Sequence, residues 1–345
     1  MSPVQEMMKR YHELASADRL SFYLTLVNNA DIDKENMEAF RNEARMKDGG
    51  CCLHCGSTHF VKNGRRADGT QRYLCRDCNK SFLASTNSIV SRTRKQLSVW
   101  KQYFDCMMAE KTLQESAREC GISMSTAFFW RHKILDCLQD VAGRVCLGGT
   151  VEADETFFNV SYKGNHTRSR EFSMPRKSHK RGGDVHTKGL SSEKVCVMCA
   201  VNENGVPIAQ VGKLGKVSSQ CVTKAFTGRI SPEATLVTDH ERAYVDFSDK
   251  EGLVLIQMET DRRTNGTYDI QRINSYHSRI KEFTRHFHGV STKYLDNYLT
   301  WYNVMFCFPK EKEDRGKLLL SHALASLRAI PGRELARRPA VPSLV

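Results

Sequence analysis

The sequence predicts an α/β domain built around a mixed sheet, preceded by two smaller modules near the N-terminus. Three observations support this fold class. Two pairs of cysteines early in the chain have the spacing of metal ligands, and two short amphipathic segments follow them. From residue 146 onward, strand-like and helix-like segments alternate, which is typical of α/β domains. The 345 residues are enough for two or three domains with a sizeable core.

The charge balance favours a polyanionic partner. Lys and Arg number 52 against 39 Asp and Glu, so the formal net charge is +13 and the sequence pI is about 9.2. A charge of this sign most often accompanies binding to nucleic acid. General solubility is the alternative, and the clustering of the charge separates the two.

The opening residues and the cysteine usage predict a compartment. The chain begins MSPVQEMMKR, which lacks the apolar core of a signal peptide, and no run of 18 apolar residues follows. We therefore expect no membrane association and a cytoplasmic, nucleoid-associated protein. Thiols stay reduced in that compartment. Where the 13 cysteines occur in pairs, they are better interpreted as metal ligands than as disulfides.

Residues 50–83 form the first module, which carries the cysteine pairs. Cys52 with Cys55 and Cys75 with Cys78 flank a stretch that resembles a β-hairpin. Four thiolates on two tight knuckles would hold one tetrahedral zinc ion. So short a segment cannot fold alone, and zinc would supply about 10 kcal/mol or more of its folding free energy. Four unrelated cysteines are the less favoured alternative. The Lys and Arg residues between the pairs suit a phosphate backbone.

Residues 84–145 form the second module, a predicted helix-turn-helix. We expect a short amphipathic helix from Leu113 to Cys120, a turn at Gly121, and a second helix that is capped by Ser123 or Ser125 and continues through Leu138. The second helix of such a motif enters the major groove of DNA. An ordinary helical hairpin is the alternative, but the place directly after a basic metal-binding module favours DNA. The residues expected to face the DNA are Thr126, Phe129, Trp130 and Lys133.

Residues 146–308 form the predicted α/β domain. Its first strand, in VEADETFF, places Glu152 and Asp154 on one face. A hairpin that turns at Asn204-Gly205, a helix, two further strands and a long helix complete the order. The strand in ATLVTDH ends at Asp239. Two aspartates brought together by adjacent strands would bind a hard divalent cation.

A basic insertion, residues 163–190, separates the first strand from the hairpin. Residues 163 to 188 hold eight Lys or Arg, against Glu171 and Asp184, and show no apolar periodicity. A solvated loop is the alternative. Beside two acidic strand ends, an arm that grips DNA is favoured. The residues expected to contact DNA are Arg176, Lys177, Lys180 and Arg181.

The long helix, in INSYHSRIKEF, has an apolar and a polar stripe. The polar stripe carries Asn274, His277 and Lys281, and His277 is expected to be an exposed helix histidine. A surface helix explains the apolar stripe, which is made of Ile273, Tyr276, Ile280, Phe283 and Phe287. The polar stripe faces either water or an active site.

The order of these motifs resembles that of insertion-sequence transposases with an N-terminal zinc ribbon and an RNase H-like catalytic domain. The resemblance spans about residues 50 to 305 and rests on the cysteine pairs, VEADETFF, VTDHERAY and NSYHSRIKEFTRHFHGVSTKYLDNYLTWYN. It implies a DDE-type recombinase whose third acid is replaced by Asn, with Lys seven residues on. The positions that match this pattern are Asp154, Asp239, Asn274 and Lys281. The first three would bind two Mg²⁺ or Mn²⁺ ions. Some relatives carry Glu at the third position, and this chain departs from them by carrying Asn274 there.

The resemblance also implies partners and an activity. The protein would bind the terminal inverted repeats of its insertion sequence and a target DNA, as a homodimer or higher oligomer, and would catalyse cleavage and strand transfer. Two alternatives stay open: a sequence-specific DNA-binding protein with a degenerate nuclease domain, and an RNase H-like nuclease without strand transfer. Residues 1–49, a helical segment, and the tail 309–345 carry no motif that bears on this choice.

Overall fold

The computed structural model describes two compact units. The described residues are 46, 50–67, 69–165, 172–175, 193–259, 264–265, 267–307, 320, 322–324, 326 and 330–342. The N-terminal unit holds those up to Leu138 with 320–332, and the sheet unit holds Gln139–Cys307 with those from Arg333. The predicted helices of residues 1–49 lie outside the described residues, apart from Met46, and so do Arg176, Lys177, Lys180 and Arg181.

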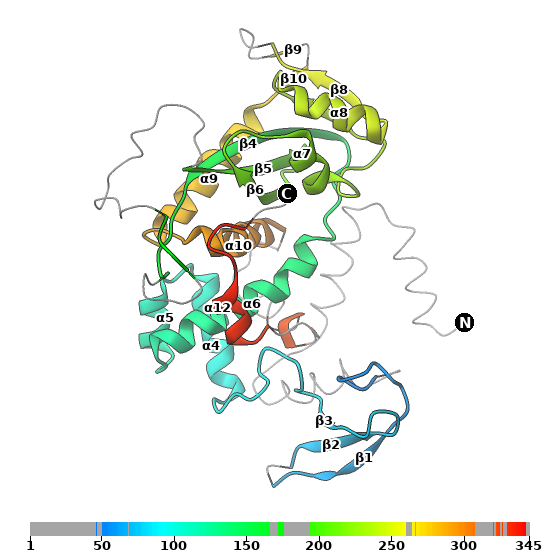
Figure 1. The fold of residues 1–345 in the computed structure, drawn as a ribbon, viewed down its shortest axis with the longest axis vertical. Helices are drawn as coiled ribbons and strands as arrows, with labels where there is room; N and C mark the ends of the chain where they lie inside the picture. The colour runs from blue at the N-terminus through cyan, green and yellow to red at the C-terminus, as the bar shows by residue number, and fades with distance from the viewer. Residues whose placement is uncertain are drawn as a thin grey trace. The chain divides into compact units, whose positions relative to one another are not determined.

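The N-terminal unit begins with a small antiparallel sheet (Figure 1). Its strands, in spatial order, are β1 (Phe60–Arg65), β2 (Gln71–Cys75) and β3 (Ser81–Leu83). Phe82 is its largest buried side chain and packs against Phe60 and Tyr73, each with ring centroids 5.5 Å away. A core of this size is too small to stabilise the module by apolar burial alone.

Three helices follow: α4 (Leu97–Met108), α5 (Leu113–Glu119) and α6 (Met124–Ala142). Thr112 begins α5 through a capping box with Glu115. Gly121 has a φ of +58°, and the Ser123 hydroxyl accepts the Thr126 N–H at 3.1 Å, which begins α6. The predicted helix, turn and second helix are therefore present, and α6 runs past Leu138.

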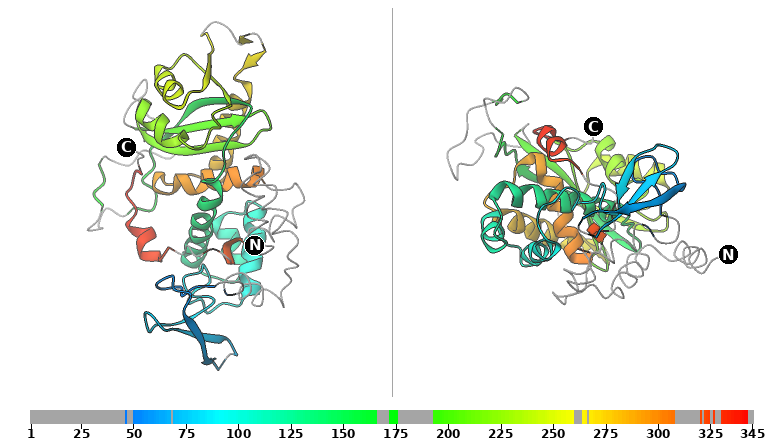
Figure 2. Two further views of the ribbon diagram at one scale, coloured as in Figure 1. Left: turned by 90° about the vertical axis from the view of Figure 1, so that its right-hand side faces the viewer. Right: turned by 90° about the horizontal axis from the view of Figure 1, so that it is seen from below.

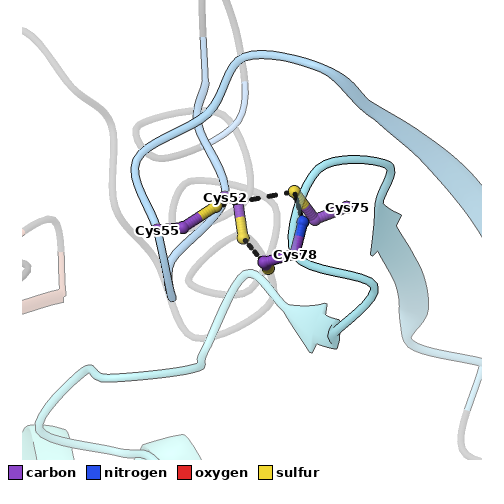
Figure 3. Close-up of side chains that lie close together, drawn as sticks. All are labelled: Cys52, Cys55, Cys75 and Cys78. Carbon is purple, nitrogen blue, oxygen red and sulfur yellow. Dashed lines mark hydrogen bonds between the residues drawn. The ribbon is translucent and has the colours of Figure 1, made fainter.

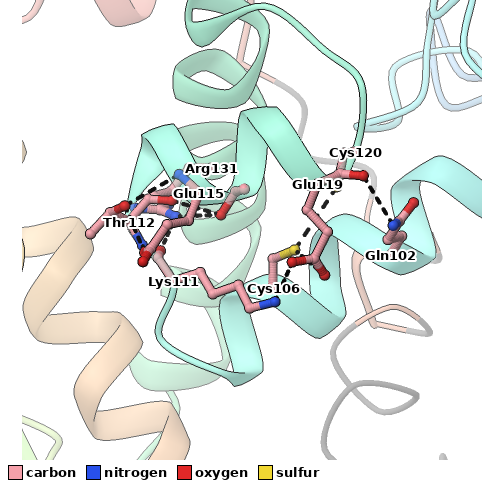
Figure 4. A network of polar contacts seen from close by, with 9 residues as sticks. Gln102, Cys106, Lys111, Thr112, Glu115, Glu119, Cys120 and Arg131 are labelled. Carbon is pink, nitrogen blue, oxygen red and sulfur yellow. Dashed lines mark hydrogen bonds and ion pairs between the residues drawn. The ribbon is translucent and has the colours of Figure 1, made fainter.

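Polar contacts tie the three helices together (Figure 4). Lys111, just before α5, pairs with Glu119 at its end. Gln102 of α4 donates to the Glu119 carbonyl at 3.2 Å, and buried Arg131 of α6 donates to the Lys111 carbonyl at 2.6 Å. The bond from Gln102 satisfies a carbonyl that α5 leaves open at its C-terminus, and the bond from Arg131 fixes the residue that precedes the N-cap of α5.

The sheet unit contains the predicted mixed sheet. Its five strands lie in the order β6-β5-β4-β7-β8. β4 pairs antiparallel with β5 and parallel with β7, and β7 pairs parallel with β8. The strands are β4 (Thr150–Asn159), β5 (Lys194–Asn202), β6 (Pro207–Leu214), β7 (Thr235–Thr238) and β8 (Val254–Gln257). The hairpin turn at Asn204-Gly205 is confirmed, with Gly205 at φ +78°.

Helices α7 (Ser219–Phe226) and α8 (Arg242–Glu251) cover one face of the sheet. The prediction included α7 and omitted α8, which connects β7 to β8. Because parallel strands cannot be joined by a tight hairpin, their pairing requires such a crossover. Cys196 and Cys199 are both fully buried in β5, so this third pair of cysteines belongs to the core of the sheet unit.

The other face is covered by α9 (Gln271–His286) and α10 (Leu295–Cys307), drawn in orange (Figure 2). All five residues of the predicted apolar stripe are buried. Phe283 packs on Trp301 of α10 with ring centroids 5.4 Å apart, and the Tyr276 hydroxyl donates to Asn303 at 2.6 Å. The remaining elements are β9 (Thr264–Asn265), β10 (Tyr268–Asp269), a 3-10 turn η1 (Thr292–Tyr294) and α12 (Gly332–Arg337).

Candidate active site and zinc site

The four predicted cysteines converge at one point (Figure 3). Their sulfur atoms all lie within 4.8 Å of one another, and the Sγ atoms of Cys52 and Cys78, and those of Cys55 and Cys75, are 3.6 Å apart. A tetrahedral zinc ion with bonds of about 2.3 Å would separate its sulfur ligands by about 3.8 Å. The Cys78 N–H donates to the Cys75 sulfur, which lowers the pKa of Cys75 to about 6. The cluster therefore fits zinc.

Asp154 and Asp239 stand side by side on neighbouring parallel strands. Ala153 pairs with Thr238, Asp154 is the next residue of β4, and Asp239 directly follows β7. Asp154 Oδ1 accepts the backbone N–H of Glu155 at 2.8 Å, and Asp239 Oδ1 accepts that of Glu241 at 3.1 Å. Within the described part of the chain, the second oxygen of each carboxylate takes no hydrogen bond and remains available to a cation.

The acidic groups around this point repel one another. Burial, and then the charge of Asp239, raise the pKa of Asp154 to about 7. Burial raises the pKa of Glu155 to about 8, with further contributions from Asp154, Asp239 and Glu241. Buried like charges disfavour ionisation, whereas a bound dication would reverse that effect. This electrostatic pattern is typical of a functional metal site.

Glu152 lies on the same strand, but its carboxylate is already engaged. Its side chain is buried, Oε1 accepts from Arg272 at 2.6 Å, and Oε2 accepts the backbone N–H of Ile273 at 2.9 Å. Glu152 is thus an anchor for the first turn of α9. Sequence reasoning missed this role, although the period of two that joins Glu152 to Asp154 placed both on the face that α9 covers.

The polar stripe of α9 is less exposed than the sequence predicts. His277 is only 8% exposed, and its Nδ1 lies 3.8 Å from Asp154 Oδ2. Burial, together with the charge of Lys281, lowers the pKa of His277 to about 4, so the imidazole is neutral. The expectation of an exposed histidine is therefore wrong, because α9 rests on β4 along a face wider than its apolar stripe.

The remaining two predicted catalytic residues, Asn274 and Lys281, also lie on α9 and differ in exposure. Lys281 is half-buried, and its charge is close enough to oppose the rise in the pKa of Asp154. Asn274 is exposed and follows Ile273, whose N–H is held by Glu152. The structure thus gathers Asp154, Asp239 and Lys281 and leaves the Asn274 side chain accessible at the start of the helix.

One predicted DNA contact is wrong. Trp130 is only 6% exposed, and its ring stacks on Trp100 with centroids 3.7 Å apart. It lies three residues after buried Ala127 and four before buried Ile134, so helical spacing places it in the core of the module. Lys133 is half-buried, and burial lowers its pKa. The residues exposed at the start of α6 are Ser123, Met124 and Ser125.

The Thr126 hydroxyl forms a hydrogen bond with the Ser123 hydroxyl at 2.9 Å, so this half-buried side chain helps to shape the turn that begins α6.

Among the described residues, no helix is long and apolar enough to span a membrane.

The sequence of the sheet unit is similar to a known domain family. The model of the ISXO2-like transposase domain matches residues 146–303. An uncharacterized protein in transposable element ISH50 of Halobacterium salinarum is 23% identical over 286 residues, which cover 82% of this chain and 94% of that protein. A chain in the crystal structure of a pre-cleavage Mos1 transpososome shares 11% sequence identity, and the match covers 64% of the present chain and 78% of the Mos1 chain. Its TM-score of 0.22 is too low to indicate a shared arrangement.

Proposed function

Because residues 146–303 form an insertion-sequence transposase domain of the DDE type, we propose that the chain binds the terminal inverted repeats of its element and catalyses DNA cleavage and strand transfer there. The observation that carries the proposal is the pair Asp154 and Asp239. Asp154 lies in the middle of β4 and Asp239 directly follows the adjacent parallel strand β7, and each carboxylate has one oxygen without a hydrogen bond among the described residues.

Magnesium or manganese fits these residues as the catalytic cofactor. Hard dications prefer carboxylate oxygens, and the raised pKa of Asp154 reflects negative charge that such an ion would neutralise. Asp154 and Asp239 would hold two ions, with Asn274 adding a neutral amide oxygen. When bound, the ions supply activation of a water or a DNA 3′-hydroxyl and stabilisation of the leaving oxygen.

The chain's own side chains orient the DNA around this pair. Lys281, two turns along α9 from Asn274, reaches the same region as Asp154 and is suited to hold a phosphate next to the cleavage point. His277 is neutral, so it adds no charge that would compete with a cation. The hydrogen bond from the Ile273 N–H to Glu152 fixes the first turn of α9 on β4, and so fixes the position of Asn274 relative to that strand.

DNA binding is assigned to both small modules and to the basic insertion. The zinc ribbon presents exposed cations, and the helix-turn-helix presents the first turn of α6, which includes Thr126, with Lys133 further along the same helix. Such a turn would enter the major groove and specify the terminal repeat. The residues proposed to hold target DNA are Arg176, Lys177, Lys180 and Arg181. Two copies would be needed to bind two element ends, so a homodimer or larger assembly forms on DNA.

A cleavage and joining assay tests the proposal. The full chain, Mg²⁺ and labelled duplexes of the element's ends should yield cut and joined products, and Asp154→Asn or Asp239→Asn should abolish both. Glu233→Gln, at an exposed carboxylate elsewhere in the sheet unit, is the matched control. Specific binding without cleavage would support a DNA-binding protein with a degenerate nuclease domain. Cleavage without joining would indicate a nuclease.

A further inference from the structure

The connector between the zinc ribbon and the helix-turn-helix, residues 84–96, is a packed part of the N-terminal unit. It begins after β3 and ends where α4 starts. Ser88 and Ile89 are fully buried, and Ala84 and Val90 are nearly so. A flexible spacer between two modules would instead be polar and exposed.

Side-chain hydrogen bonds hold the connector at both ends. Asn87 donates to the carbonyl of Leu53, between the first two zinc ligands, at 2.6 Å. Lys95 donates to the carbonyl of Gly121, in the turn before α6, at 3.2 Å. Between these points Thr93 accepts from the indole of buried Trp100 at 3.3 Å. The connector is thus attached to the zinc knuckle and to the turn of the helix-turn-helix.

Its exposed side chains carry positive charge that other groups do not neutralise. Arg92, at φ +60°, and Arg94 are both exposed. In the described part of the chain neither arginine forms an ion pair. Two acids of the helical module have partners of their own, since Asp105 pairs with Lys101 and Glu119 with Lys111. Two guanidinium groups on an anchored segment form a ready site for an anionic ligand.

We propose that Arg92 and Arg94 bind phosphates of the duplex between the stretch contacted by the zinc ribbon and the stretch contacted by α6. The zinc ribbon, the connector and the helix-turn-helix then form one continuous DNA-binding surface. The ligand is the sugar-phosphate backbone, which positions a protein on DNA without specifying bases. This inference rests on the proposed function, because it requires the chain to bind the element's ends.

Salt-dependent binding tests it with the full-length, zinc-loaded chain. Fluorescence anisotropy with a terminal-repeat duplex gives the slope of log affinity against log salt concentration. Each lost phosphate contact should reduce the size of that slope by about 0.9. Arg92→Gln and Arg94→Gln should each do so, and the double variant should reduce it by about 1.8 and weaken binding at least about tenfold. Lys101→Gln removes an equal charge from an existing ion pair and should leave the slope unchanged.

A second variant separates anchoring from charge. Asn87→Ala removes the bond to Leu53 without altering charge, so it should weaken binding while the slope stays as in the wild type. Hydroxyl-radical footprints should show one uninterrupted protected stretch for the wild type and a gap for the double variant. Wild-type slope and footprint in the double variant would overturn the inference alone. If the wild-type chain does not prefer its element's ends to random duplex, the proposed function falls as well.

Discussion

The Glu152 carboxylate accepts the backbone N–H of Ile273 at 2.9 Å, which joins strand β4 to the first turn of α9. Asp154 lies two residues further along the strand, and Asn274 lies one residue further along the helix. The relative position of these two proposed metal ligands therefore depends on a third residue, whose own carboxylate oxygens are both engaged by α9. The positive end of the helix dipole and the Arg272 guanidinium both stabilise the buried charge.

Glu152→Gln should separate positioning from folding. Glutamine keeps an acceptor for the Ile273 N–H but loses the ion pair with Arg272, which is half-exposed and can turn to solvent. We expect Mn²⁺ binding by Asp154 and Asp239 to persist while cleavage slows by about 10- to 100-fold, as small misplacements of catalytic groups do. Glu282→Gln, an exposed change on the same helix, is the control and should cleave normally. If Glu282→Gln slowed cleavage and Glu152→Gln did not, the positioning role would belong to Glu282.

Zinc content gives an independent prediction. Purified protein should contain about one zinc per chain, and Cys75→Ser should lose it and unfold the ribbon, because the module has little apolar core. Cys51→Ser should keep the metal, since Cys51 lies outside the cluster. Metal analysis and the binding of terminal-repeat DNA report both effects. A folded, reduced, zinc-free wild-type protein would refute the assignment.

Substitution of Asn274 should cost less than that of either aspartate. A neutral amide attracts a dication more weakly than a carboxylate, so Asn274→Ala should slow cleavage by about tenfold at limiting Mg²⁺, whereas Asp154→Ala abolishes it. Asn274→Glu should keep metal binding and alter the rate, because its side chain is longer and charged. Ser275→Ala, the exposed neighbour, is the control. Wild-type cleavage by Asn274→Ala at limiting Mg²⁺ would remove Asn274 from the site.

Metal affinity should depend on pH through Asp154. Burial and Asp239 raise its pKa to about 7, so below that pH protons compete with the cation. Mn²⁺ affinity, measured by calorimetry, should rise between pH 6 and 8. In the metal-free protein, the stability of the fold should change with pH in the opposite direction to metal affinity. The folded state binds the proton better than the unfolded state, so the contribution of Asp154 to stability falls as pH rises from about 3.8 to about 7. A flat affinity across this range would contradict the prediction.

Trp130 should be important for stability and not for DNA contact. Trp130→Ala should destabilise the N-terminal unit by about 3–5 kcal/mol, as large-to-small changes in a core do, and thermal unfolding measures this loss. Trp130→Phe keeps an aromatic ring in the core and should bind terminal-repeat DNA with wild-type affinity once folded. A selective loss of DNA affinity in the folded phenylalanine variant would return Trp130 to the interface.

Local patterns in the sequence determined the elements whose formation depends on near neighbours. The cysteine spacing predicted the cluster now seen at Cys52, Cys55, Cys75 and Cys78, and the Asn204-Gly205 turn and the apolar stripe of α9 were predicted at their observed places. Knuckles, tight turns and amphipathic faces each arise from a few consecutive residues, so short-range reading suffices for them.

Which polar residues are buried, and what they contact, depends on how distant segments pack together. His277 and Trp130 were both predicted to face outward, yet β4 covers one and Trp100 the other. Glu152 faces the same side of β4 as Asp154, but it lies beneath the first turn of α9 and anchors that helix instead of offering its carboxylate to a metal. The period of a helix or strand gives the direction of a side chain relative to its own element. What lies in that direction is set by segments more than a hundred residues away, such as the 121 positions between Glu152 and Ile273.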